Sequence, residues 1–233
     1  MVAEVNLPII IGASLIDGIN PCAFGVLIFM LAYLMKVTKD RHVLLINGFT
    51  YIFAVFLTYL AAGLLLLPII QQLGSLSVAF YVILGILIVI AGLLEIKDYF
   101  WYGQGLSLQI FPSQAERIKH YVARVGSKKS TAFELGVFVA LVELPCTGAV
   151  YLAVLAMMSQ AGLGAATMAK HVFFLLLYNF IFILPLIGIL LGVYQGMSTE
   201  SFKIWHQKHK GLMRLLTGLL LIAMGAWMLL SVW

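Results

Sequence analysis

Long apolar stretches separated by short polar ones dominate the chain, and six of them are long enough to form a helix across a bilayer. A spanning helix needs about 20 mostly apolar residues. Lipid offers the backbone no hydrogen-bond partners, and the short alternating strands of a barrel do not occur here, so helices are expected. The six segments are Leu7–Met35, Val43–Ile70, Val78–Leu94, Ala132–Ser159, Met168–Val193 and Gly211–Val232. This pattern predicts an all-α membrane protein with six transmembrane helices.

Composition supports a lipid environment, and loop charge predicts an orientation. The chain is 63% hydrophobic and 10% charged, whereas soluble domains are about 45–50% apolar and about 25% charged. Of the 14 lysines and arginines, all except Lys170 lie in or beside the first, third and fifth connecting loops. Because positively charged loops remain cytoplasmic, we expect both termini outside the cell. The net charge of +5 is explained by this bias, so no nucleic-acid partner is expected.

The two halves of the chain resemble each other in spacing. Gly12 lies ten residues before Cys22, Gly136 lies ten residues before Cys146, and these pairs are offset by 124 positions. At an offset of 133, two glycines of the third segment match two of the sixth: Gly85 and Gly92 with Gly218 and Gly225. Three spans in each half make the second half inverted relative to the first. Inverted repeats with interrupted helices indicate a functional centre at the membrane midplane.

The repeat predicts a first three-helix unit over residues 1–96 and a second over residues 132–233. Residues 97–131 form a basic cytoplasmic linker between them. Within the linker, apolar residues of Ala115–Val125 recur at near-helical spacing among basic ones. A short amphipathic helix on the membrane surface and a solvated basic linker are both compatible with this stretch.

A proline precedes each cysteine near the middle of the first and fourth segments. Proline lacks a backbone donor and clashes with the carbonyl four residues earlier, so it breaks or kinks a helix. The sequences are Asn20-Pro21-Cys22 and Pro145-Cys146-Thr147-Gly148. Irregular backbone at membrane depth persists only where protein or a water-filled cavity satisfies it. We therefore expect broken first and fourth helices, with each cysteine on an irregular segment.

Cys22 and Cys146 are the only cysteines of the chain, and they are the candidate catalytic residues. A single cysteine in a membrane helix is usually a small packing residue. Two that both follow proline at matching positions are hard to explain by packing alone. Repeat symmetry allows the short Cα separation that a disulfide needs, which predicts a redox-active dithiol/disulfide.

Neighbouring polar residues are candidates for supporting roles. Glu143, three residues before Cys146, is a candidate acceptor for a thiol proton. Asp17 is a weaker one, because a residue five positions before Cys22 does not share its face on a regular helix. Asn20 and Thr147 flank the cysteines and are expected to satisfy backbone groups that the prolines free.

The paired motifs and the six apolar segments resemble the CcdA family of cytochrome c biogenesis proteins and the membrane domain of DsbD-type thiol:disulfide interchange proteins. The resemblance covers nearly the whole chain and implies a Cys22–Cys146 disulfide. It implies that two electrons pass from cytoplasmic thioredoxin to an extracytoplasmic thioredoxin-like protein, in support of cytochrome c maturation. It also implies the plasma membrane of a prokaryote, with a thylakoid membrane as the other option. No metal or cofactor is expected.

Three other functions are compatible with parts of the pattern. A secondary exporter of a small solute would use the same inverted repeat with incidental cysteines. A quinone-linked disulfide-forming enzyme would usually carry a Cys-x-x-Cys pair, which this chain lacks. A structural assembly subunit would tolerate Cys22→Ser without loss.

Overall fold

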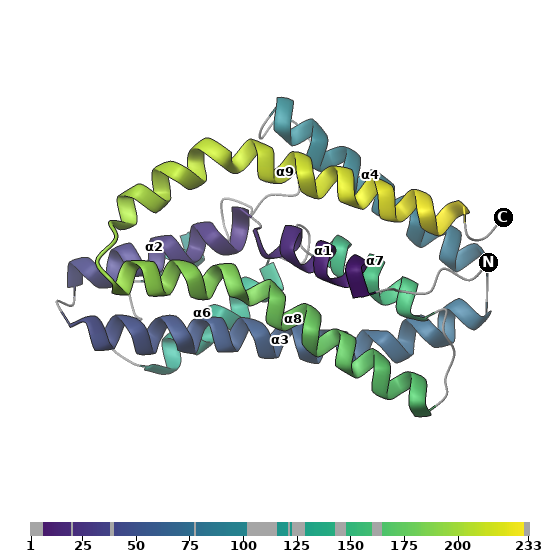
Figure 1. The fold of residues 1–233 in the computed structure, drawn as a ribbon, viewed down its shortest axis with the longest axis horizontal. Helices are drawn as coiled ribbons and strands as arrows, with labels where there is room; N and C mark the ends of the chain where they lie inside the picture. Colours follow the sequence, from purple (N-terminus) through teal and green to yellow (C-terminus); the bar gives the residue numbers. More distant parts are fainter. Residues whose placement is uncertain are drawn as a thin grey trace.

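In the computed structural model, every regular element of the described residues is a helix (Figure 1). The structure describes residues 7–19, 21–37, 40–76, 78–101, 116–120, 122, 129–142, 148–159 and 165–230. The helices are α1 (Leu7–Gly18), α2 (Pro21–Val37), α3 (Arg41–Leu76), α4 (Val78–Phe100), α6 (Lys129–Val142), α7 (Gly148–Ser159), α8 (Ala165–Tyr194) and α9 (Thr199–Leu230).

The helices have the length and surface of a membrane protein. Within the described residues, three segments are long and apolar enough to cross a membrane: Arg41–Ile70, Ala169–Tyr194 and Thr199–Leu230. The shorter apolar helices follow each other along the chain in two pairs, α1 with α2 and α6 with α7. Large apolar side chains such as Phe53, Leu65 and Phe180 face outward. So many exposed apolar side chains indicate contact with lipid, which supports an all-α membrane protein.

The predicted interruption of the first apolar segment is present. Helix α1 ends at Gly18, and α2 begins at Pro21. Between them the Ile19 amide bonds to the Ile16 carbonyl at 3.3 Å, which closes a tight turn. Proline suits the first turn of a helix, where its missing N–H would have no intrahelical partner. In the second half, α6 ends at Val142 and α7 begins at Gly148, and the residues between them lie outside the described part.

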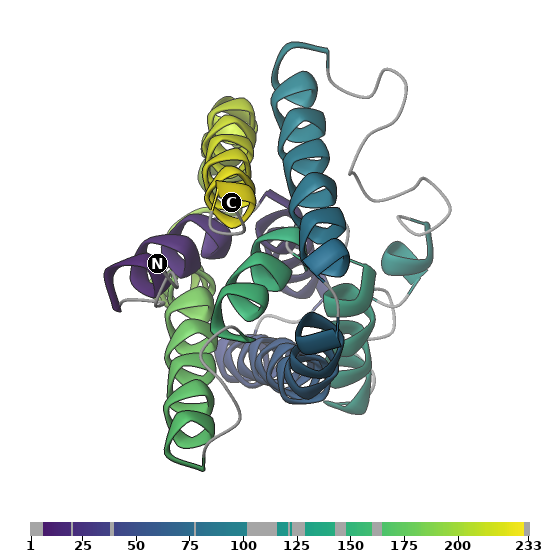
Figure 2. The same ribbon diagram turned by 90° about the vertical axis from the view of Figure 1, so that its right-hand side faces the viewer.

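Helices α4 and α9 pack side by side through glycines (Figures 1 and 2). A Cβ added at Gly92 would lie 2.8 Å from the Gly218 carbonyl oxygen, and the reverse distance is also 2.8 Å. A Cβ at Gly225 would lie 3.1 Å from the Gly85 carbonyl oxygen. Because only glycine leaves room for such backbone contact, these four positions set how closely the helices approach. The pairing of Gly85 with Gly225 and of Gly92 with Gly218 makes the two helices antiparallel.

The contacts between α4 and α9 occur in matched pairs. Adding 133 to the residue number on α4 and subtracting 133 from the one on α9 converts one contact of a pair into the other. The glycine pair Gly85 and Gly225 becomes Gly218 and Gly92 under this shift. Two further pairs behave in the same way: Gly85–Leu229 with Gly218–Ile96, and Gly225–Val89 with Gly92–Ile222. Two closely packed antiparallel helices have a local twofold axis between them, which relates such contacts.

The last helix begins earlier than the apolar pattern predicted. The expected start at Gly211 was wrong, because α9 begins at Thr199 and includes the basic stretch that was assigned to a loop. The Ser198 hydroxyl accepts a hydrogen bond from the Glu200 amide at 3.2 Å, as a helix N-cap does. Charged residues along 199–210 form an exposed face of this first part, so low hydropathy did not mean absence of helix.

A glycine ends the helix before it. Gly196 has a φ of 103°, and its amide bonds to the Val193 carbonyl at 3.0 Å, while the Met197 amide bonds to the Gly192 carbonyl at 3.0 Å. These two bonds form a Schellman cap, which requires a left-handed residue that glycine adopts without steric cost. The turn between α8 and α9 is therefore encoded locally, in residues 192–200.

Two connections that were predicted to share one side of the membrane meet in the structure. The Arg41 guanidinium, at the start of α3, donates to the Tyr194 carbonyl at the end of α8 at 3.4 Å. Figure 1 shows the end of α9 at the opposite end of the molecule.

Part of the linker between α4 and α6 is helical. Residues 116–120 and 122 have helical backbone, with Ile118 and Val122 buried and Arg117 and Lys119 exposed. This is the polarity of the predicted amphipathic helix. The linker is also shorter than predicted at both ends, because α4 continues to Phe100 and α6 begins at Lys129.

Two glycines at matching positions of the repeat should respond differently to substitution. A Cβ at Gly136 would lie 2.6 Å from the Tyr51 carbonyl oxygen on α3, whereas one at Gly12 would meet nothing within 4 Å. We expect Gly136→Ala to destabilise the fold by about 1–3 kcal/mol through overpacking. The control Gly12→Ala should be neutral or stabilise it slightly, because alanine is the better helix former. Thermal unfolding in detergent, followed by circular dichroism, measures both, and equal transition temperatures would contradict this packing.

Candidate functional site

The two cysteines both fall where the second helix of an interrupted pair begins. Cys22 is the second residue of α2, and Cys146 lies two residues before the first residue of α7, Gly148, which is buried. Free backbone N–H groups and the positive end of the helix dipole stabilise a thiolate at such a position. The backbone of Pro21 and Cys22 is described without their side chains. The other predicted site residues lie outside the described part: Asn20, Glu143, Pro145, Cys146 and Thr147.

The four short helices on either side of the interruptions contact each other crosswise. Helix α1 contacts α7, and α2 contacts α6. In the sequence, α1 precedes the interruption before Cys22, and α7 follows the one that contains Cys146. The short helices that flank the two interruptions are thus in contact, with α7 in the middle of the bundle and α1 at its side (Figure 2).

Longer helices fix these short ones from outside. Helix α1 packs on α8, where a Cβ at Gly18 would lie 2.7 Å from the Phe182 carbonyl oxygen. Helix α6 packs on α3 in the corresponding way through Gly136. The end of α1, four residues before Cys22, therefore rests against the α8 backbone with no space for a side chain.

A buried polar network lies beside the first interruption. Asp17, in the last turn of α1, is fully buried and accepts a hydrogen bond from the Tyr178 hydroxyl on α8 at 2.7 Å. The Tyr178 ring lies 5.3 Å from the Tyr151 ring on α7. The Tyr151 hydroxyl donates to the Tyr59 carbonyl on α3 at 2.8 Å. The Asn179 side-chain amide donates to the Tyr151 hydroxyl at 3.3 Å.

Four helices thus contribute polar groups to a region of otherwise apolar packing. We call this set of Asp17, Tyr59, Tyr151, Tyr178 and Asn179 the tyrosine network. Burial of polar groups is costly unless they are hydrogen-bonded, so the network fixes how α1, α3, α7 and α8 meet. Sequence reasoning did not find its tyrosines, because an aromatic residue in an apolar segment looks like a packing residue. The available signal was an asparagine and an aspartate within spanning segments.

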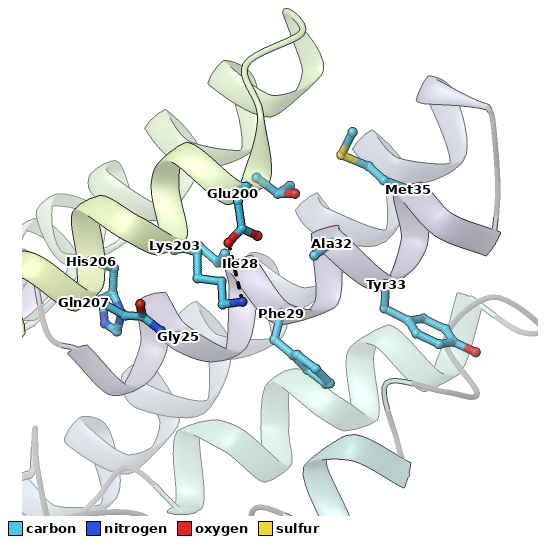
Figure 3. A pocket seen from close by; sticks show the side chains of 11 residues that line it. Gly25, Ile28, Phe29, Ala32, Tyr33, Met35, Glu200, Lys203, His206 and Gln207 are labelled. Carbon is cyan, nitrogen blue, oxygen red and sulfur yellow. Dashed lines mark ion pairs between the residues drawn. The ribbon is translucent and has the colours of Figure 1, made fainter.

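A groove of about 650 Å³ lies between α2 and the first part of α9 (Figure 3). It is lined on the α2 side by Gly25 and Phe29 and on the α9 side by Lys203 and His206. Gly25 lies three residues after Cys22, about one helical turn away. The His206 ring also stacks on Phe24, with ring centroids 6.5 Å apart. The groove therefore reaches the start of α2.

A second buried polar cluster joins α4 to α9 by charge. The Arg214 guanidinium lies 2.6 Å from Asp98 and 3.6 Å from Glu95, and all three side chains are buried. Lys97 also lies 2.8 Å from Asp98. These charges compensate each other between two long helices, which indicates a structural role.

No family model matches the chain, no curated protein matches it, and no solved structure matches it. Its function is therefore argued from the residues and their arrangement.

Proposed function

We propose that the protein is a transmembrane thiol-disulfide oxidoreductase. It passes two electrons from cytoplasmic thioredoxin, through a Cys22–Cys146 disulfide, to an extracytoplasmic thioredoxin-like protein. The observation that carries this proposal is the matching sequence position of the only two cysteines: Cys22 is the second residue of α2, and Cys146 lies two residues before α7 in the sequence. The contacts of α1 with α7 and of α2 with α6 support it. Support of cytochrome c maturation follows from the resemblance to the CcdA family.

The proposal includes six spans arranged as two inverted repeats, with α1–α2 and α6–α7 as interrupted spans. Several contacts between helices support this pairing, because they have counterparts in the other half. The two halves correspond when α1 is matched with α6, α2 with α7, α3 with α8 and α4 with α9. Under this match the contact α1–α8 corresponds to α3–α6, α1–α7 to α2–α6, and α2–α9 to α4–α7. The exchange of single contacts between α4 and α9 supports it residue by residue.

The chemistry is two successive thiol-disulfide exchanges. A thiolate of reduced thioredoxin attacks one sulfur of the Cys22–Cys146 disulfide, so a mixed disulfide forms and the other cysteine leaves as a thiolate. The second thioredoxin thiol then resolves the mixed disulfide, and its proton passes to the cysteine that it displaces. Thioredoxin leaves oxidised, and the membrane protein holds two thiols and the electron pair. The outer partner's disulfide is reduced by the same two steps in reverse.

Soluble partners on both sides must reach this pair in turn. The groove between α2 and α9 provides a path on the side of the basic loops, because it is lined by Lys203 and reaches within one turn of Cys22. A path open to both sides at once would leak, so access alternates between two conformations. With positive loops in the cytoplasm, electrons enter through the groove and leave on the side of the termini.

Two measurements test the proposal. Alkylation of the unfolded wild-type protein should detect no free thiol after mild oxidation and two free thiols after treatment with reduced thioredoxin. The Cys22→Ser variant should show one free thiol in both states. Inside-out vesicles should then carry electrons from external thioredoxin to an enclosed thioredoxin-like acceptor. Two free thiols after oxidation would contradict the redox proposal and favour a solute exporter, whose cysteines are incidental.

A further inference from the structure

The carboxyl at the end of α1 has a partner for only one of its oxygens. Asp17 is fully buried, and its Oδ2 accepts the hydrogen bond from Tyr178. Among the described residues, Oδ1 has no hydrogen-bond partner and Asp17 forms no ion pair. Buried carboxyls are otherwise hydrogen-bonded on both oxygens or paired with a cation, because an uncompensated charge is costly. Asp17 is therefore more than a structural hydrogen-bond acceptor.

The titratable groups around Asp17 are phenols. Helices α7, α8 and α9 pack on α1. In their described residues, the titratable side chains that interact with the Asp17 carboxyl are Tyr178 of α8 and, behind it, Tyr151 of α7. Tyr59 of α3 stacks edge-on against Tyr151 at 5.7 Å. None of these neighbours is a cation that would pair with the carboxylate. The charge of the Asp17 carboxyl therefore changes by gain or loss of a proton.

The tyrosine network also includes residues that are close in sequence to both cysteines. Asp17 lies five residues before Cys22, and Tyr151 lies five residues after Cys146. Since α1 ends at Gly18, the regular helical spacing that would turn Asp17 away from Cys22 stops one residue after it. Helix α1 also contacts α7, the helix that follows Cys146 in the sequence. Asp17 therefore lies in the last turn of α1, and Cys22 lies in the first turn of the next helix.

We propose that the Asp17 carboxyl exchanges a proton with the thiols of the redox site, an inference that rests on the proposed function. When thioredoxin breaks the Cys22–Cys146 bond, the protonated carboxyl gives its proton to the leaving thiolate. The carboxylate that remains is held by the Tyr178 hydroxyl. In the outward step the carboxylate takes a proton back from the attacking thiol. Each cycle moves two electrons and returns the proton to Asp17, so no further reactant is needed.

Single-turnover reduction of the oxidised protein by reduced thioredoxin, quenched by alkylation and measured between about pH 5 and 9, tests this role. General acid–base groups contribute about 100-fold or more, so Asp17→Asn should slow reduction about 100-fold near neutral pH and should lose one limb of the pH profile. Tyr178→Phe should keep that limb but move it along the pH axis. The matched control is Ser14→Ala on the same helix. Ser14 is equally buried and bonds only within α1, to the Ile10 carbonyl at 2.7 Å and to the Ile11 carbonyl at 3.1 Å. This control should keep the wild-type rate and profile.

The outcomes separate the two proposals. Asp17→Asn with the wild-type rate and pH profile overturns the role of Asp17 while leaving the redox function intact. If Asp17→Asn does not fold, Tyr178→Phe decides, and an unchanged profile in that variant overturns the role. A wild-type protein with no reducible disulfide overturns the redox function and this inference together.

Discussion

Vesicles that contain Cys22→Ser or Cys146→Ser should transfer no electrons above the background of empty vesicles. Serine cannot form the disulfide that carries the electron pair, so loss of either sulfur stops the cycle completely. The Ser14→Ala variant, altered in a buried hydroxyl on α1, should transfer at the wild-type rate. Transfer by a single-cysteine variant at more than a few per cent of the wild-type rate would contradict the mechanism.

The two single-cysteine variants should also differ in what they capture. Because the groove between α2 and α9 ends one turn from Cys22, Cys22 should be the thiol that cytoplasmic thioredoxin reaches. A thioredoxin without its resolving cysteine, activated as a mixed disulfide with thionitrobenzoate, should therefore be captured by Cys146→Ser. Cys22→Ser, which keeps only Cys146, should capture much less. Non-reducing electrophoresis shows the adduct, and equal capture by both variants would contradict an access path along α2.

Replacement of Arg214 by methionine should destabilise the protein by about 3–5 kcal/mol, which is the usual effect of removing one partner from a buried ion pair. The side chains of Asp98 and Glu95 are 0% and 4% exposed, so the substitution leaves negative charge where water cannot solvate it. Lys97 still lies 2.8 Å from Asp98, and its partial compensation favours the lower part of this range. Unfolding in detergent, followed by circular dichroism, measures the loss.

An exposed ion pair of the same protein supplies the control. Lys203 and Glu200 lie 3.7 Å apart on α9, with side chains 55% and 65% exposed. Exposed pairs contribute about 0–1 kcal/mol, so Lys203→Met should change stability by less than that. Adding Asp98→Asn and Glu95→Gln to Arg214→Met should recover most of the lost stability, because no uncompensated charge remains. If the triple variant is no more stable than Arg214→Met, the loss comes from packing of the arginine rather than from charge.

Much of the fold could be predicted because its determinants are local. The apolar segments follow from the hydropathy of single residues, which does not depend on the fold. The interruption before Cys22 follows from Pro21. The start of α9 was missed because helix formation there depends on the Ser198 cap and an exposed charged face rather than on hydropathy. The sequence argument against Asp17 assumed a regular helix through Gly18, and α1 ends there.

The sequence by itself determined that this is a helical membrane protein, and it singled out Cys22 and Cys146 within matching proline motifs. It did so because hydropathy, proline geometry and the rarity of cysteine are properties of single residues and their neighbours. Only the tertiary structure decided which distant groups meet: Asp17 with Tyr178, Arg214 with Asp98, and Gly92 with Gly218. The physical reason is that these contacts join residues far apart in the chain, so they depend on how helices cross and on which faces they bury. No local pattern in the sequence contains that information.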